Sequence, residues 1–224
     1  MKNSQNPFSS TSSRTLTLVV MVGLLATRVS QAAVLISGLY NTGVNDAGQV
    51  LPLQSQELHY SVSGATTMSY VVPKVSQWVA APSGSAWIGP NPTASNWPLD
   101  PTGMYYYKLS FSLSAVEASN LQISGLWSGD DTSEIWVNNQ YTGLHIENWG
   151  AFVNLNHFLL QGQFVEGMNT LEFRVLNVYQ AQYPNGNPTG LLVAGLSAEV
   201  VPEPATATLV GLGIASLVVF RRRR

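Results

Sequence analysis

The sequence predicts an all-β protein, an antiparallel β-sandwich or jelly roll, on three observations. Apolar and polar residues alternate with a period of two through much of residues 34–200, which is the spacing of strands with one buried face. Clusters of Gly, Asn and Pro interrupt these runs at short intervals, as turns between antiparallel strands do. No stretch of comparable length shows a helical period with capping residues.

The clearest strand lies at residues 105–113, where apolar side chains at odd positions alternate with Tyr106, Lys108 and serines. We expect it to be a central strand. Three other segments place apolar residues on one face: Leu121, Ile123 and Trp127; Ile135 and Val137; Leu171, Phe173 and Val175. His157 is in phase with Leu155 and Leu159, which predicts a core or rim histidine. We expect a turn at residues 167–169.

The segment from residue 34 to 200 is predicted to be one domain. A chain of that size buries roughly 70% of its unfolded surface, which is enough for one core. The sequence contains no cysteine, so disulfides, thiolate metal sites and cysteine nucleophiles are all excluded.

Charge is unevenly distributed along the chain. The formal net charge is −2, but the body from Ala33 to Val200 has only three basic residues, Lys74, Lys108 and Arg174, against eleven carboxylates, a net charge of −8. Such a surface repels phosphate backbones, so we expect no nucleic-acid partner.

The C-terminal segment combines a short apolar stretch with a basic end. Ala205–Phe220 contains 16 uncharged residues and would form a helix of about 24 Å, somewhat short of the roughly 30 Å hydrocarbon core. Pro202 and Pro204 stop the helix on its N-terminal side. The arginines at 221–224 are too costly to bury in lipid and stay cytoplasmic. We therefore predict a single transmembrane helix at residues 205–220, and an ordinary tail anchor is the simpler alternative.

These features together resemble the PEP-CTERM sorting signal of bacteria that make exopolysaccharide. The signal covers residues 201–224 and consists of Val201, Pro202, Glu203 and Pro204, the apolar span, and Arg221, Arg222, Arg223 and Arg224. The resemblance implies cleavage near the tripeptide by an exosortase. It also implies transient residence in the inner membrane, and then release to the cell surface or extracellular matrix with exopolysaccharide as a candidate partner.

Residues 1–33 have the pattern of a secretory signal peptide. Lys2 and Arg14 precede an apolar core at residues 16–26, and small residues favour cleavage between Ala32 and Ala33 by way of the general secretion translocon. Arg28 lies between the apolar core and this cleavage site, which leaves a retained N-terminal anchor as an alternative.

The body also resembles a known domain class over residues 58–200. The resemblance rests on an ordered series of segments at residues 86–90, 103–107, 126–131, 135–139, 164–171 and 188–191. The series is similar to the jelly-roll domains of many sorted proteins, which share the layout of galactose-binding-like modules. Asn138-Asn139 stands where that class has Asn-Gly, and Asn can adopt the left-handed conformation that such a turn needs.

Asp130, Asp131 and Glu134 form the densest acidic cluster. Carboxylate oxygens are the ligands that Ca²⁺ prefers, so calcium is a candidate cofactor here. The cluster lacks a calcium-loop spacing, and a solvated turn is the alternative. His59, His145 and His157 show no metal-binding spacing, and no other cofactor is predicted.

The sequence predicts a non-enzymatic protein. It contains no Gly-x-Ser-x-Gly elbow and no recognisable pair of glycosidase carboxylates. The alternative is a secreted carbohydrate-active hydrolase, which two carboxyl groups about 5–10 Å apart in an open cleft would favour.

Tryptophans supply the remaining functional signal. Trp127 is in phase with the core, whereas Trp136 faces the other side of its strand. An exposed indole stacks well on a sugar ring, so Trp87, Trp97, Trp136 and Trp149 are the candidate carbohydrate-binding residues. The alternative is that the proline-rich loop at residues 80–104 covers Trp136 or Trp149.

Overall fold

The computed structural model describes residues 35–95, 97–147 and 150–201. One sheet of five strands consists, in spatial order, of β1 (Ser61–Gly64), β4 (Gly103–Leu113), β9 (Gly167–Asn177), β6 (Thr132–Val137) and β7 (Gln140–Ile146). The other consists of β2 (Tyr70–Val71), β3 (Ile88–Gly89), β10 (Gly190–Val200), β5 (Leu121–Asp130) and β8 (Asn156–Gln161). Two short helices, α1 (Ala115–Asn120) and α2 (Gly150–Val153), complete the described elements.

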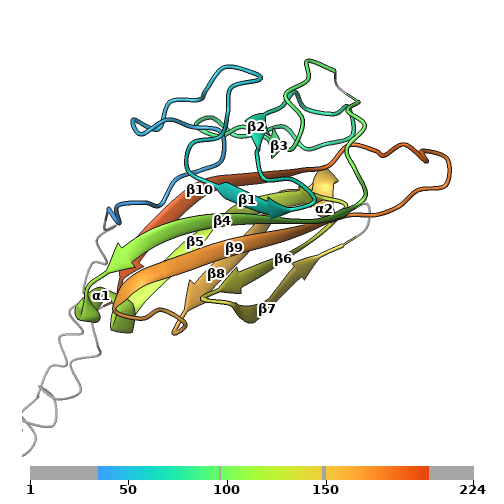
Figure 1. Cartoon of the computed structure of the whole chain (residues 1–224). Helices are drawn as coiled ribbons and strands as arrows, with labels where there is room; N and C mark the ends of the chain where they lie inside the picture. The colour runs from blue at the N-terminus through green and yellow to red at the C-terminus, as the bar shows by residue number, and fades with distance from the viewer. Residues whose placement is uncertain (1–34, 96, 148–149, 202–224) are drawn as a thin grey trace, which may run out of the picture. The chain divides into compact units, whose positions relative to one another are not determined.

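Neighbouring strands pair antiparallel throughout both sheets, and the sheets pack face to face (Figure 1). The predicted antiparallel β-sandwich is therefore confirmed. The expected strand at residues 105–113 is β4, which begins two residues earlier and pairs with β1 and β9 on its two sides.

The core lies between the sheets and follows the predicted alternation. In β9, Leu171, Phe173 and Val175 are fully buried, and the odd positions of β4 from Tyr105 to Leu113 are buried as well. Trp127 from β5 packs against Phe173 with ring centroids 5.9 Å apart, which joins the two sheets. Period-two patterning therefore identified the inward faces of the long strands.

The prediction for β8 was wrong in phase. His157 and Leu159 are exposed, while Phe158 and Leu160 are buried. Phe158 makes an edge-to-face contact with Phe173, with centroids 6.0 Å apart. Packing of this aromatic pair outweighs the weaker apolar signal of the other phase.

Two turns show how local residues end strands. Asn138 and Asn139 have φ values of 50° and 62°, which is the geometry of a tight turn between β6 and β7. Residues 167–169 are not a turn, because β9 already begins at Gly167. Gly167 has a φ of 87°, so it supplies the positive φ at the point where the chain enters the strand.

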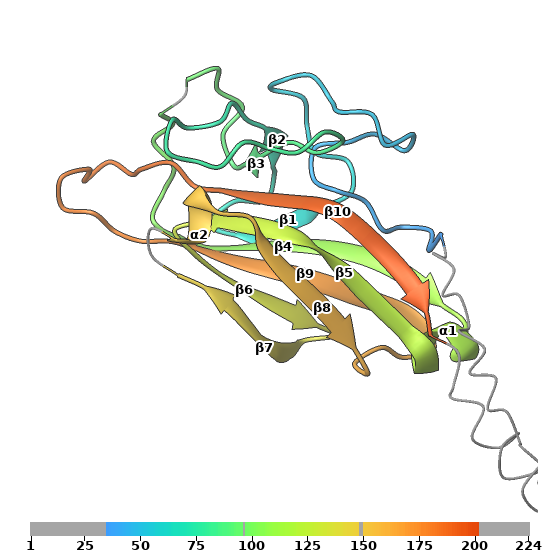
Figure 2. The same cartoon turned by 180° about the vertical axis from the view of Figure 1, so that it is seen from behind.

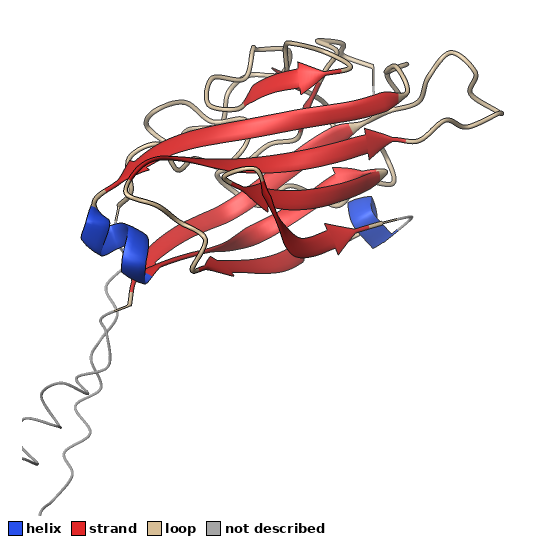
Figure 3. Cartoon of the chain, turned by 60° about the horizontal axis from the view of Figure 1, so that its bottom comes forward, coloured by secondary structure: helices blue, strands red, loops and turns tan. Residues whose placement is uncertain are grey.

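The loops that contain β2 and β3 lie along one edge of the sandwich, beside β10 and β1 (Figures 1 and 2). Thr42 donates its N–H to the Val193 carbonyl at 3.0 Å. The proline-rich segment at residues 80–104 contributes Trp87 to a second apolar cluster of buried residues, Val72, Val75, Trp78, Trp87, Phe152 and Leu192. Figure 3 shows that α1 and α2 lie at opposite ends of the sandwich.

Within the described ranges, no helix combines the length and the hydropathy needed to cross a bilayer. The predicted signal peptide with Ala32 and Ala33, the predicted helix at 205–220 and the sorting residues beyond Val201 lie outside the described residues. Val201 itself donates its N–H to the Asn120 carbonyl at 2.9 Å, which ties the end of β10 to α1.

Candidate functional site

A pocket of about 230 Å³ opens at the end of the sandwich opposite α1. Five connections meet there: β2–β3, β3–β4, β5–β6, the β7–β8 connection that contains α2, and β9–β10, the last of which is the long orange loop in Figure 1. The lining consists of Val75, Gln77, Trp78, Trp97, Asp130, Asp131, Phe152, Gln180, Gln182, Tyr183, Asn187 and Pro188. It combines aromatic rings, amide side chains and two carboxyl groups.

Aromatic rings line the pocket at two levels. Trp97 and Tyr183 face each other across two loops, with ring centroids 5.3 Å apart and planes tilted by 58°. Both rings are partly exposed, and Tyr183 is 38% accessible. Trp78 lies deeper and rests on Trp87, whose ring centroid is 4.2 Å away. The upper pair is therefore free to contact a ligand, while the lower pair forms a fixed floor.

Amide side chains form the polar part of the lining. Gln182 donates Nε2 to Gln180 Oε1 at 3.2 Å, and Gln180 donates Nε2 to Asn187 Oδ1 at 3.5 Å. Asn187 is buried and also donates Nδ2 to the Val178 carbonyl at 3.0 Å, so it anchors the chain. The primary amides of Gln180 and Gln182 have both donors and acceptors and can exchange hydrogen bonds with the hydroxyl groups of a ligand.

Asp130 and Asp131 form the acidic side of the pocket. Asp130 is 6% exposed, its Oδ2 accepts a hydrogen bond from Trp78 Nε1 at 2.7 Å, and its Oδ1 is buried without a hydrogen-bond partner. Burial, and then the charge of Asp131, hold the pKa of Asp130 well above its usual range. Asp131 Oδ2 accepts the Val178 N–H at 2.8 Å, which fixes its carboxylate at the start of the β9–β10 loop.

A second buried carboxyl group, Asp100, holds the base of the pocket together. Asp100 is 1% exposed, and its Oδ2 accepts the Thr189 N–H at 3.1 Å. Thr189 also donates its hydroxyl to the Asp130 carbonyl. Burial raises the pKa of Asp100 to about 7, against the opposing effect of the Thr189 hydrogen bond. These bonds connect the β3–β4, β5–β6 and β9–β10 connections.

The acidic cluster predicted as a calcium site is divided in the structure. Asp130 and Asp131 line the pocket, whereas Glu134 accepts a hydrogen bond from Trp136 Nε1 at 2.9 Å on β6. Among the described residues, no group of three or more His, Cys, Asp and Glu side chains is placed to hold a metal ion.

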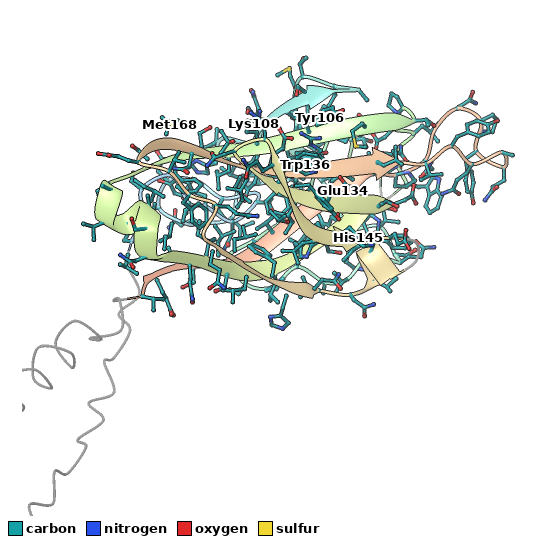
Figure 4. The ribbon with its side chains drawn as sticks, turned by 90° about the horizontal axis from the view of Figure 1, so that it is seen from below. Tyr106, Lys108, Glu134, Trp136, His145 and Met168 are labelled. Atoms are coloured by element: carbon teal, nitrogen blue, oxygen red, sulfur yellow. The ribbon has the colours of Figure 1, made fainter. Side chains whose placement is uncertain are left out.

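Trp136 lies on the outer face of the sheet formed by β1, β4, β9, β6 and β7, as its alternation predicted (Figure 4). The guanidinium of Arg174 lies over its ring, and Tyr141 packs beside it with a centroid distance of 5.4 Å. The neighbours that cover Trp136 are thus side chains of its own sheet. Lys108 and Glu172 form an ion pair of 3.1 Å on the same face.

The predicted carbohydrate-binding residues therefore separate into three groups. Trp97 lines the pocket, Trp87 supports it from behind Trp78, and Trp136 belongs to the outer face. Trp149 lies outside the described residues.

Sequence reasoning missed Trp78, Tyr183 and the amides of the lining. A signal for them exists, since an amide directly precedes an aromatic residue in both Gln77-Trp78 and Gln182-Tyr183. Both pairs lie in loops, where a rigid scaffold commonly positions binding residues.

Comparisons with solved structures find β-rich domains at low similarity. The CBM36-1 domain of a multidomain xylanase from the hindgut metagenome of Trinervitermes trinervoides is 7% identical, with 50% of this chain and 90% of that chain covered and a TM-score of 0.28. CBM35 from Paenibacillus barcinonensis is 11% identical, with 60% of this chain and 96% of that chain covered and a TM-score of 0.30. A β-glucosidase from Kluyveromyces marxianus in complex with glucose is 10% identical, with 75% of this chain and 18% of that chain covered and a TM-score of 0.26.

No curated protein matches the chain. Residues 200–224, however, match the family model described as the PEP-CTERM protein-sorting motif. The match includes the Pro-Glu-Pro tripeptide, the apolar span and the terminal arginines on which the sequence prediction rested. The chain therefore carries a PEP-CTERM sorting motif, which marks it as an exported protein that an exosortase processes.

Proposed function

We propose that this exosortase-sorted protein is a non-enzymatic glycan-binding protein of the cell surface or extracellular matrix, and that its sandwich binds polysaccharide in the pocket at the loop end. The observation that carries the proposal is the combination, in one concave site, of the Trp97–Tyr183 ring pair with the amide chain from Gln182 to Asn187.

This lining matches the two kinds of surface that a sugar ring presents. The C–H face of a pyranose is apolar and stacks on aromatic rings such as Trp97 and Tyr183. Its hydroxyl groups both donate and accept, as do the side-chain amides of Gln180 and Gln182. The volume of about 230 Å³ is below the ~300–1,000 Å³ typical of sites for drug-sized ligands, which suits one sugar unit of a chain.

Export and charge support an extracellular glycan as the partner. The sorting motif belongs to proteins that leave the cytoplasm, and the acidic body disfavours nucleic acid. Exopolysaccharide is the polymer that the motif's family associates with such proteins, so we propose it as the natural ligand.

The arrangement of carboxyl groups supports binding over hydrolysis. A glycosidase uses two carboxyl groups about 5–10 Å apart on either side of the scissile bond. The two carboxyl groups of the pocket belong to consecutive residues, and Asp130 is buried against Trp78. They lie on one side of the pocket, which suits recognition of a group and not attack from two faces.

The test is glycan binding by the full chain and two matched tryptophan variants. Trp97→Ala removes one ring of the pocket and should weaken binding by about tenfold, the scale of a lost stacking contact. Trp136→Ala makes the same change on the outer face and should leave binding unaltered. A loss confined to Trp136→Ala would move the binding site to the outer face, and equal affinity in all three proteins would contradict the proposal.

A further inference from the structure

The pocket carries one sign of charge. Its described lining contains Asp130 and Asp131 and no Lys, Arg or His. It therefore presents a negative potential to any ligand that enters.

The three basic residues of the body all pair with groups other than the carboxyl groups of Asp130 and Asp131. Lys74 donates Nζ to the carbonyls of Val75, Ser76 and Trp78 at 3.1, 3.0 and 2.8 Å. Lys108 and Arg174 both pair with Glu172 on the outer face, at 3.1 and 2.6 Å. The negative charge of the pocket therefore has no cation of the described body paired with it.

A buried acceptor points to the kind of group that belongs there. Asp130 Oδ1 is buried in the pocket wall without a hydrogen-bond partner, while Oδ2 is held by the Trp78 indole. When Asp130 is ionised, this buried oxygen lacks a donor, which costs about 1–3 kcal/mol, and a ligand that supplies a donor removes this cost.

We propose that the pocket selects a glycan with free amino groups, such as a deacetylated hexosamine, and binds its ammonium group at Asp130 and Asp131. This inference rests on the proposed function of glycan binding. The sugar ring then lies against Trp97 and Tyr183. An ammonium group has three donors and a full positive charge, which matches adjacent carboxyl groups.

Two related sugar classes fit less well. Acetylation of the amine removes its charge and two of its donors, so an N-acetylated sugar loses the ionic contact but keeps the stacking. A uronic acid brings a carboxylate next to Asp131 and is repelled. Burial and the charge of Asp131 favour the protonated form of Asp130 in the free protein, so binding of the ammonium group at the two carboxyl groups releases the Asp130 proton to solvent.

The experiment compares three oligosaccharide series on the full chain by calorimetric titration: glucosamine, N-acetylglucosamine and glucuronic acid. We expect the glucosamine series to bind at least about tenfold more tightly than the acetylated series, and the glucuronic acid series to bind most weakly. The preference should shrink with added salt, because charge–charge contacts at a partly open site are screened.

Asp131→Asn tests the residue assignment. The amide keeps an oxygen for the Val178 N–H but removes the charge, so binding to the acetylated series should persist while the preference for amines falls to about twofold or less. Glu134→Gln is the matched control on the outer face and should leave the preference intact. Should Asp131→Asn fail to fold, competition of the unaltered chain with free glucosamine against free glucose measures the same preference.

The outcomes separate this inference from the proposed function. Equal binding of the amino and acetylated series, sensitive to Trp97→Ala, would overturn the amine preference and leave glycan binding in place. Binding that requires Ca²⁺ and disappears with a chelator would overturn it in favour of a metal at the same carboxyl groups. If the folded chain binds no glycan, both the amine preference and the proposed glycan binding are wrong.

Discussion

The guanidinium carbon of Arg174 lies 3.6 Å from the centroid of the Trp136 ring, and the Nε of the same side chain lies 2.6 Å from Glu172 Oε1. One residue of β9 thus makes a cation–π contact with β6 and an ion pair with a carboxylate that is 5% exposed. Lys108 on β4 completes the row at 3.1 Å from the other oxygen of Glu172.

Arg174→Ala should therefore destabilise the sandwich without affecting the pocket. It removes the stacking contact, worth about 0.5–2 kcal/mol, and leaves the buried Glu172 with Lys108 as its remaining partner. We expect a loss of about 1–3 kcal/mol in the free energy of unfolding, measured by urea denaturation. Arg174→Lys retains the charge but not the planar group and should recover part of the loss. A variant as stable as the parent would show that this row contributes little.

Trp78→Phe tests the floor of the pocket. The change keeps an aromatic ring on Trp87 but removes the indole N–H that reaches Asp130 Oδ2, so the buried carboxyl group loses that hydrogen bond. The expected cost is about 1–3 kcal/mol. Trp87→Phe removes an N–H that reaches the neutral Val79 carbonyl and is the comparison, with a smaller expected cost of about 0.5–1.5 kcal/mol for the hydrogen bond. A larger loss of stability in Trp87→Phe than in Trp78→Phe would show that the hydrogen bond to Val79 contributes more than the one to Asp130.

Stability should fall as pH rises through the neutral range. Asp100 titrates near 3.8 in the unfolded chain and near 7 in the folded protein, so between these values the folded state binds more protons than the unfolded one. The free energy of unfolding then decreases with pH, by up to about 1.4 kcal/mol per pH unit for one proton. Asp130, whose pKa is also raised, continues the fall above pH 7.

Asp100→Asn isolates the first of these contributions. The amide oxygen still accepts the Thr189 N–H, but the group no longer titrates. Thermal unfolding followed from pH 4 to pH 7 should show a slope reduced by about one proton relative to the parent chain. An unchanged slope would assign the pH dependence to other groups.

The sorting motif can be tested apart from the sandwich. Replacing Pro202, Glu203 and Pro204 by alanine keeps the apolar span and the arginines, so an anchor would still work, whereas recognition by an exosortase should fail. We expect the variant to accumulate at full length in the inner membrane, while the unaltered chain is processed normally. Mass spectrometry of the mature C-terminus provides the readout. Mature surface protein that retains Arg221–Arg224 would contradict cleavage at this motif.

The strand faces could be predicted where only one phase is apolar. Leu171, Phe173 and Val175 alternate with Thr170, Glu172 and Arg174, and hydrophobic burial then leaves a single choice. In β8 the run His157-Phe158-Leu159-Leu160 offers apolar residues in both phases. Phe158 is favoured by its edge-to-face contact with Phe173 and by the space at Gly125 on the neighbouring strand, where an added Cβ would lie 2.8 Å from the Phe158 ring. A contact between residues 33 positions apart cannot be inferred from either segment alone.

In the candidate site, too, the sequence predicts local features but not the contacts between distant loops. Asp130 and Asp131 are adjacent in sequence, so their cluster was visible, and Trp97 was identified as a loop tryptophan. Their meeting with Tyr183 depends on Thr189, which binds Asp100 and Asp130 at once. Hydrogen bonds of this kind join distant loops and leave no periodic signal in the sequence.

The direction of β10 places the pocket and the C-terminal end of the sandwich at opposite ends of one strand. Gly190 begins the strand beside the pocket residue Pro188, and Val200 ends it beside α1, two positions before the tripeptide of the sorting motif. Eleven strand residues span about 35 Å. A partner that binds directly after β10 would therefore contact the sandwich at the end opposite the pocket, about 35 Å from it.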